Sequence, residues 1–191
     1  LSLPVNLIAG LGLSLLLNHE LPGMRGFRTL FYLPVVLSGV SVALMWAWLL
    51  NPEYGVINTL LATIGITGPQ WFWSTRWALP SVALMSLWRV GGSAIIYLAG
   101  LKNIPPHLYE AAEIDGANRW ARLRHITLPM LTPTIFFQLV MELIDAFQVF
   151  TAVYVITGGG PVRSTLFYMY LIFRTAFEDF DMGYASALAW I

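Results

Sequence analysis

The sequence predicts an all-α protein, a polytopic membrane helix bundle with a cytoplasmic helix–glycine–helix loop. Hydrophobic residues make up 58% of the 191 positions and charged residues only 10%, and the mean hydropathy is +0.70. A soluble domain carries about 25% charged residues because its surface must face water. Several apolar runs also approach the roughly 20 residues that a helix needs to cross about 30 Å of hydrocarbon. A lipid bilayer is therefore the solvent that fits this composition.

Five apolar runs are the candidate membrane spans. Their approximate bounds are residues 1–17, 30–50, 79–101, 130–156 and 184–191. The third run is broken only by Arg89, and the fourth contains Glu142 and Asp145. Residues 164–177 are typical of a partly amphipathic helix at the membrane surface. Because the sequence begins without Met and ends inside an apolar run, we expect residues 1–191 to be one transmembrane domain of a longer chain.

The distribution of Lys and Arg predicts which connections face the cytoplasm. Connections 18–29 and 102–127 hold six of these residues, and connections 51–78 and 157–183 hold three. Cytoplasmic loops of membrane proteins carry the excess of basic residues. The long loop 102–129 is therefore expected in the cytoplasm. The opposite connection contains Trp71, Phe72, Trp73 and Trp77, which suit a membrane–water interface.

The loop 102–129 contains signals for two short helices. Pro105 and Pro106 suit the first turn of a helix, where a missing N–H is tolerated. Residues 108–115 form two further turns, and Gly116 predicts a stop because glycine adopts the left-handed conformation without steric cost. A second helix is expected over residues 117–126. Pro129 and Pro133 then predict the re-entry into the membrane.

The residues of this loop also carry a family resemblance. The tripeptide Glu110-Ala111-Ala112, followed by Gly116 and by Ile126-Thr127-Leu128-Pro129, resembles the EAA loop of binding-protein-dependent ABC permeases. Further stretches along the chain are similar to the maltose and glycerol-3-phosphate type of these subunits, and together they cover essentially the whole sequence. They are Phe27-Arg28, Leu33-Pro34, Pro52, Gly55, Asn58, Ala99-Gly100-Leu101, the run from Thr157 to Pro161 with Thr165, Ala176-Phe177, and the run from Gly183 to Ala187.

The resemblance implies a non-catalytic permease subunit for a sugar-like solute, without a cofactor, in a bacterial or archaeal cell (inner) membrane. Its partners would be a cytoplasmic ATPase dimer, a second permease subunit, an extracytoplasmic solute-binding protein and membrane lipid. In the family the EAA loop forms a coupling helix that docks on the ATPase. The coupling residues implied here are Glu110, Ala111, Ala112, Asp115 and Gly116.

Polar residues on the fourth run form a candidate translocation path. Gln138, Glu142, Asp145 and Gln148 follow one another at spacings of four, three and three, which places them on one broad face of a helix. An ionised side chain at the bilayer centre costs roughly 2.5–3.5 kcal/mol on translocon scales, so such residues face a partner or a wet cavity. Two interpretations stay open: the face lines the path of the solute, or it holds helices together with Arg89 as a countercharge.

The sequence lacks the residues that a phosphate-binding loop, a metal site or a nucleic-acid interface would need. The run from Gly158 to Pro161 has no following Lys-Ser/Thr, so a tight external turn is expected rather than a phosphate loop. The chain has no Cys, its three His residues are scattered, and its net charge is zero, so neither a metal site nor a nucleic-acid partner is expected. Two alternative functions would use Glu142 and Asp145: an ion-coupled secondary transporter and an intramembrane enzyme. Neither of them explains the cytoplasmic loop.

Overall fold

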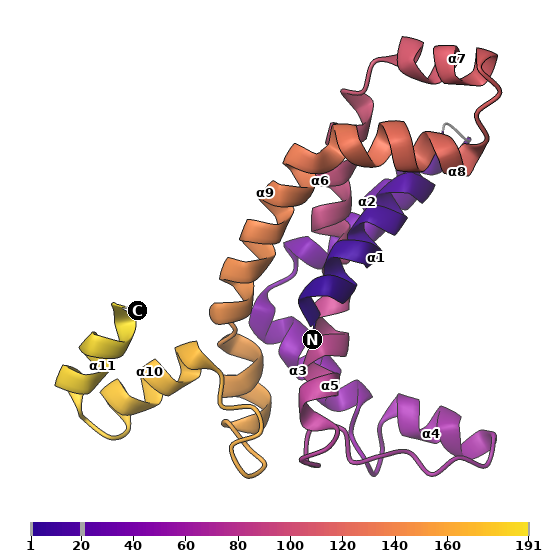
Figure 1. Cartoon of the computed structure of the whole chain (residues 1–191). Helices are drawn as coiled ribbons and strands as arrows, with labels where there is room; N and C mark the ends of the chain where they lie inside the picture. The colour runs from indigo at the N-terminus through magenta and orange to yellow at the C-terminus, as the bar shows by residue number, and fades with distance from the viewer. Residues whose placement is uncertain (1, 20–21, 191) are drawn as a thin grey trace. The chain divides into compact units, whose positions relative to one another are not determined.

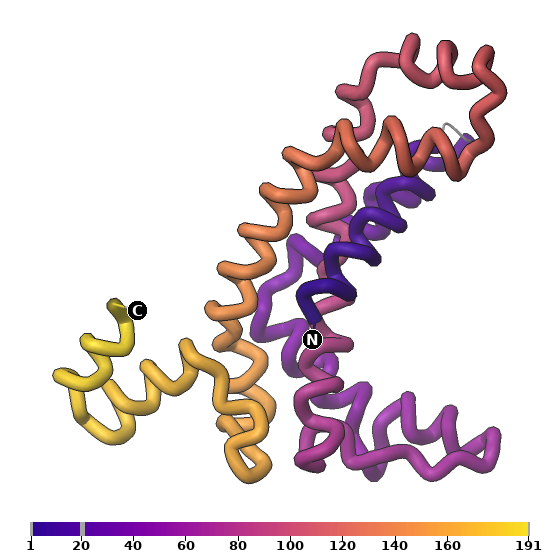
Figure 2. The backbone as a smooth tube through the Cα atoms, viewed as in Figure 1, coloured from indigo at the N-terminus to yellow at the C-terminus, as the bar shows by residue number. Residues whose placement is uncertain are grey.

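The computed structural model describes residues 2–19 and 22–190, and in this part of the chain the regular elements are helices (Figures 1 and 2). The predicted all-α fold is confirmed. Contacts between residues divide the chain into two compact units. Unit 1 comprises Leu1–Val36 and Ser86–Leu143, and unit 2 comprises Leu37–Met85 and Ile144–Ile191.

Unit 1 is built around helix α6 and carries the candidate coupling loop. Helices α1 and α2 both pack against α6. The elements of this unit are α1 (Ser2–Leu17), α2 (Met24–Val36), α6 (Val90–Lys102), α7 (Pro106–Ile114), α8 (Arg119–Arg122), the π-helical turn η1 (Leu123–Thr127) and α9 (Leu128–Phe147), whose last four residues belong to unit 2. Arg28 joins α1 to α2, because its guanidinium Nη2 donates to the carbonyl oxygen of Leu17 over 2.7 Å.

Glycines allow the helices of unit 1 to approach closely. A side chain at Gly91 would collide with the backbone carbonyl of Phe31 on α2. A Cβ at Gly10 of α1 would lie 2.8 Å from the Ser93 hydroxyl, and one at Gly100 would lie 2.7 Å from the hydroxyl of Thr134 on α9. In a membrane, where lipid is as apolar as the helix surface, such small residues favour association by van der Waals packing. Three neighbouring helices therefore meet α6 at positions where only a small residue fits.

Unit 2 contains shorter elements around an aromatic core. Leu50, Phe72 and Val82 form its buried centre, against which Trp46, Ile57, Trp71, Val149, Ile156 and Phe167 pack. Its elements are α3 (Gly39–Leu49), α4 (Val56–Thr63), most of α5 (Ala78–Leu87), the π-helical turn η2 (Val153–Thr157), α10 (Tyr168–Phe177) and α11 (Met182–Ala189). Helices α10 and α11 lie side by side after a short connection (Figure 2).

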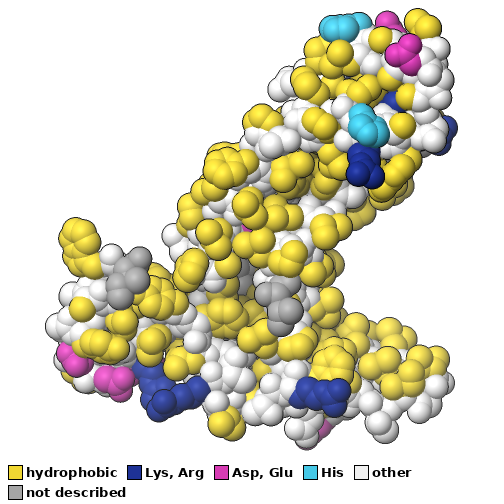
Figure 3. All heavy atoms as spheres, in the orientation of Figure 1, with side chains coloured by type: hydrophobic (Ala, Val, Ile, Leu, Met, Phe, Trp, Pro, Cys, Tyr) yellow, Lys and Arg dark blue, Asp and Glu magenta, His cyan; other side chains and the backbone are white. Residues whose placement is uncertain are grey.

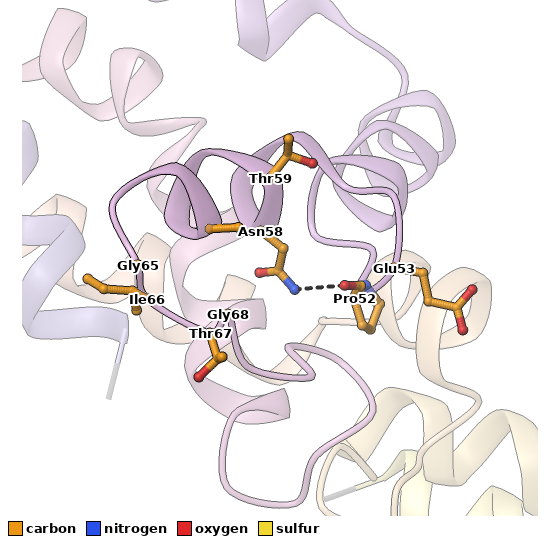
Figure 4. A pocket seen from close by; sticks show the side chains of 9 residues that line it. Pro52, Glu53, Asn58, Thr59, Gly65, Ile66, Thr67 and Gly68 are labelled. Carbon is orange, nitrogen blue, oxygen red and sulfur yellow. Dashed lines mark hydrogen bonds between the residues drawn. The ribbon is translucent and has the colours of Figure 1, made fainter.

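The connection between α3 and α5 is folded around Asn58. The amide Nδ2 of Asn58 donates to the carbonyl oxygens of Pro52 and Pro69, and its Oδ1 accepts from the indole N–H of Trp71 over 2.8 Å. Gly68 lies directly against the Asn58 side chain, where a larger residue would not fit. Figure 4 shows the open hollow that Asn58 lines together with Pro52 and Gly68. The buried amide of Asn58, on helix α4, thus holds the residues before and after that helix in place through hydrogen bonds.

The second and third predicted spans are interrupted, which corrects the expected continuous runs 30–50 and 79–101. The second divides into α2 and α3 around Leu37 and Ser38, and the third divides into α5 and α6 around Trp88 and Arg89. Pro34 removes one backbone hydrogen bond shortly before the first break, and Ser38 and Gly39 are weak helix formers. Apolar composition alone does not report such breaks, because the flanking residues stay hydrophobic.

The fourth predicted span, 130–156, is wrong at both ends. Helical residues run without a gap from Arg119 to Phe147 and stop there. Neither Pro129 nor Pro133 ends the helix: Pro133 lies inside α9, and Pro129 comes two residues after the wide π turn η1. That turn gives room to the carbonyl of His125, which the ring of Pro129 would otherwise crowd. Residues 148–150 are not helical, and no Gly or Pro marks this stop in the sequence.

The C-terminal elements also begin at other residues than expected. The surface helix expected over 164–177 begins only at Tyr168. The run from Gly158 to Pro161 is a turn, as predicted, with positive φ angles at Gly158 and Gly159. The last helix starts at Met182, where the carboxylate of Asp181 accepts from the backbone N–H of Tyr184. Leu1 and Ile191, at the ends of the first and fifth predicted spans, lie outside the described residues.

Within residues 2–19 and 22–190, one continuous helix, Arg119–Phe147, is long and apolar enough to cross a membrane. Two interrupted pairs, α2 with α3 and α5 with α6, are also long and apolar enough to cross a membrane if each pair is one span. Helix α1 is apolar but shorter. Figure 3 shows hydrophobic side chains over much of the displayed surface of α9, with His, Arg and acidic side chains around α7 and α8.

We predict that Gly91→Ala destabilises the protein by about 1–3 kcal/mol or more, because the new methyl group meets backbone atoms of α2 that have no rotamer to escape into. The matched control is Gly12→Ala in α1, where nothing lies within 4 Å of the added Cβ. Thermal unfolding of the detergent-solubilised protein measures both. Equal unfolding temperatures for the two variants would contradict the close packing of α2 on α6.

Candidate functional site

The first arm of the loop 102–129 is a short helix with defined ends. Pro105 is the N-cap of α7 and Pro106 its first residue, as expected from their place in the first turn, and the helix ends at Ile114. Gly116 has a φ of +76°. Its N–H donates to the carbonyl of Glu113, and the N–H of Ala117 donates to that of Ala112 over 2.8 Å. These two bonds form a Schellman motif, which confirms the glycine stop predicted from the sequence.

The second arm is not the separate helix expected over residues 117–126. Asn118 caps it, because its Oδ1 accepts from the N–H of Ala121 over 2.8 Å. After the single turn of α8 the chain enters η1 and continues directly into α9. The arm that leaves the glycine turn is therefore the start of the long helix. A displacement of the loop acts on α9 without an intervening linker.

Side-chain contacts hold the two arms together. The hydroxyls of Tyr109 and Thr127 lie 3.0 Å apart, and the guanidinium of Arg122 lies 3.2 Å from the carboxylate of Glu113. Beneath them, the apolar cluster of Leu101, Ile104 and Leu131 contacts the loop residues Leu108, Tyr109 and Ile126. The base of the loop is thereby part of the core of unit 1.

Helix α7 has an inner and an outer face. Leu108 and Tyr109 are half-buried on the side of the apolar cluster, and so is Ala112, one helical turn later. The implied coupling residues Glu110, Ala111, Asp115 and Gly116 are exposed. Ala112 therefore lies on the other face from Ala111, although the resemblance had assigned both to close approach of the ATPase.

The sequence interpretation missed an exposed apolar residue on the outer face. The side chain of Ile114 is 88% exposed, one turn after Glu110. Apolar residues that stand singly on a protein surface are common, so the exposure of Ile114 places it on the outer face of α7 and assigns it no partner by itself. The sequence could have shown this residue, because Ile114 is an apolar residue between two acidic ones, Glu113 and Asp115.

Two of the four polar residues expected on the translocation path make contacts between helices instead. Gln138 is 3% exposed, and its Nε2 donates to the carbonyl oxygen of Ser93 on α6 over 3.3 Å. The half-buried carboxylate of Glu142 accepts from the amide of Asn6 on α1, also over 3.3 Å. Asn6 in turn donates to the hydroxyl of Ser86. A polar residue in the apolar run 1–17 was the sequence signal for this network.

The other two polar residues have exposed side chains. Asp145 lies on the last turn of α9, and Gln148 lies beyond the end of that helix at Phe147, so the expected helical face of four residues is wrong at Gln148. The expected countercharge Arg89 is exposed, and the ion pairs found within residues 2–19 and 22–190 do not include it. Within the same residues, no group of three or more His, Asp or Glu side chains is placed to hold a metal ion.

Comparisons with known proteins bear on the whole chain. The probable ABC transporter permease protein YesP of Bacillus subtilis is 47% identical in an alignment of 192 positions, which covers 98% of this chain and 62% of YesP. The sulfoquinovosyl glycerol transport system permease protein SmoG of Agrobacterium fabrum is 39% identical over 99% of this chain and 62% of its own length. The chain thus spans about three fifths of the curated relatives that it matches.

A solved structure is similar to the same extent. One chain of a bacterial ABC transporter involved in the import of the acidic polysaccharide alginate superposes with a TM-score of 0.89 and 30% sequence identity, over 98% of this chain and 67% of that one. Residues 7–191 match the family described as the binding-protein-dependent transport system inner membrane component. The chain belongs to this family of transporter components.

Proposed function

We propose that the chain is part of a permease subunit of an ATP-binding-cassette importer, in which it forms half of the translocation path for a sugar or related polar solute. The observation that carries the proposal is the loop 102–129. A helix with fixed ends presents an acidic and apolar face outward while its other face belongs to the core of unit 1. Such a surface suits a cytoplasmic ATPase dimer, and in this proposal a solute-binding protein, which the family description names, and a second permease subunit complete the complex.

The outer face of α7 would do the docking. Glu110 and Ile114 lie one turn apart and exposed, so a groove on the ATPase would meet a carboxylate and an apolar side chain together. Beside these two residues, Ala111 and Gly116 have small side chains or none, so the partner surface would approach the helix backbone closely. Since α7 has defined ends and two contacts to the following arm, closure of the ATPase dimer around ATP would move the loop as a body rather than unfold it.

The solute class is supported by the relatives and by two exposed side chains. The relatives that match are named as transporters of sulfoquinovosyl glycerol, sn-glycerol-3-phosphate and trehalose/maltose, all rich in hydroxyl groups. Asp145 and Gln148 have exposed side chains whose polar groups suit the hydroxyl groups of such a solute. Ion coupling through Glu142 is not favoured, because its carboxylate is engaged by Asn6.

We predict that Glu110→Lys and Gly116→Val each reduce co-purification of the ATPase subunits and uncouple ATP hydrolysis from uptake. The first reverses a charge on the docking face. The second places a β-branched residue at a φ of +76°, which costs roughly 1–2 kcal/mol per residue and disrupts the helix end. Gly116→Asn is the matched control, because Asn tolerates this conformation, and it should retain most of the coupling.

A charge control for Glu110→Lys is Asp179→Lys, an exposed acidic residue between α10 and α11 on the side expected to face away from the cytoplasm. It should leave ATPase binding unchanged. If Glu110→Lys bound the ATPase as tightly as the wild-type protein and supported normal uptake, the docking role of α7 would be wrong.

A second prediction separates the residues of the path from those that join helices. Asp145→Asn and Gln148→Ala should change the apparent affinity for the solute at unchanged unfolding temperature. Gln138→Leu should lower the unfolding temperature, because it removes a hydrogen bond between helices that contributes about 0.6 kcal/mol on average in membrane proteins. Glu142→Gln should be mild, since its amide oxygen still accepts from Asn6. Uptake assays and thermal unfolding of the same preparations measure both properties; unchanged uptake and solute range in the first pair would contradict the path.

A further inference from the structure

Two side-chain contacts connect α7 to the arm that follows Gly116, within the described chain. The carboxylate of Glu113 meets Arg122 near the turn, and the hydroxyl of Tyr109 meets that of Thr127 at the base of the loop. Both close the same hairpin of two helices. They differ in their surroundings, and that difference decides which of them transmits a force.

The contact near the turn is a surface ion pair. The side chain of Glu113 is 72% exposed and that of Arg122 23%. Exposed pairs of this kind contribute about 0–1 kcal/mol, because water and salt screen them and two long side chains lose freedom. A single ion pair in water does not hold α7 in place under load.

The contact at the base is shielded. Tyr109 is half-buried among the apolar side chains that extend the cluster of Leu101, Ile104 and Leu131, and Thr127 is buried. The Thr127 hydroxyl also lies 3.4 Å from the carbonyl oxygen of Arg122, and either hydroxyl can donate in the bond between Tyr109 and Thr127. A hydrogen bond in apolar surroundings faces less competition from water.

The position of this bond is what gives it a role. Tyr109 directly precedes Glu110 on the docking helix, and Thr127 is the last residue of η1, directly before α9. The bond joins residues 18 apart in the sequence and bypasses the turn at Gly116. Without it, a load on the outer face of α7 would be taken up partly by rotation of α7 about the connections at its two ends.

We infer that Tyr109 is a positioning residue, whose hydroxyl passes the displacement of the docking helix to the N-terminus of α9 through Thr127. The inference rests on the proposed function. In that function Glu110 and Ile114, on the outer face of α7, bind the ATPase, whereas Tyr109 faces inward and takes no part in that binding. Loss of the hydroxyl therefore separates transmission from docking.

The test uses the assembled transporter in proteoliposomes, with its ATPase, partner permease and binding protein, and measures solute taken up per ATP hydrolysed. Tyr109→Phe removes one oxygen atom and keeps the apolar packing. We expect normal assembly and continued ATP hydrolysis, with uptake per ATP reduced several-fold. Thr127→Val should have the same effect, the double variant should be no worse than either, and Thr127→Ser should restore coupling.

Tyr168→Phe is the matched control, because Tyr168 donates its phenol hydrogen to the carbonyl of Leu188 in unit 2. It should leave uptake per ATP unchanged. If Tyr109→Phe takes up as much solute per ATP as the wild-type protein, the inference is overturned. It is also overturned if less folded complex forms while the uptake per ATP is unchanged, because that result indicates a structural role alone. If Glu110→Lys releases the ATPase while Tyr109→Phe has no effect, this inference fails and the proposed function stands; if both have no effect, the proposed function fails.

Discussion

The close approach of helices to α6 is the constraint on which unit 1 depends. Lipid offers no hydrophobic force that pushes one apolar helix onto another, so the association relies on fit and on hydrogen bonds. Gly10, Gly91 and Gly100 supply the fit to α1, α2 and α9. Gln138 supplies a hydrogen bond from α9 to α6, and Asn6 supplies one from α1 to Glu142 of α9. The helix that ends at Lys102, just before the loop, is thus the one most closely packed in the unit.

This packing explains why the loop can be both exposed and fixed. The chain leaves α6 through Leu101 and Ile104, which are buried with Leu131 of α9, and α7 sits on that cluster through Leu108 and Tyr109. The two arms of the loop therefore stand on the two helices that Gly100 brings together. The outer face of α7 stays free for a partner while the inner face is committed to the core.

Local chemistry was read correctly from the sequence, and helix continuity was not. Pro106 at the start of α7 and the left-handed Gly116 at its end follow from backbone sterics that any context preserves. The breaks at Ser38 and Arg89 lie between hydrophobic residues, so the apolar composition of these runs does not show them. Spacing placed Gln138 and Glu142 on one face with Asp145 correctly, but could not tell a buried contact from an open surface. Asn6 and Ser93, their partners, lie more than 40 residues away in the sequence.

The most direct test of the account is a disulfide cross-link from the outer face of α7 to the ATPase. The chain contains no Cys, so a single Ile114→Cys reports on one position. Oxidation of the assembled complex with single-Cys variants along the ATPase surface should trap a covalent product, and Val162→Cys, equally exposed but expected on the external side, should trap none. A cross-link from position 162 and none from position 114 would contradict the central claim.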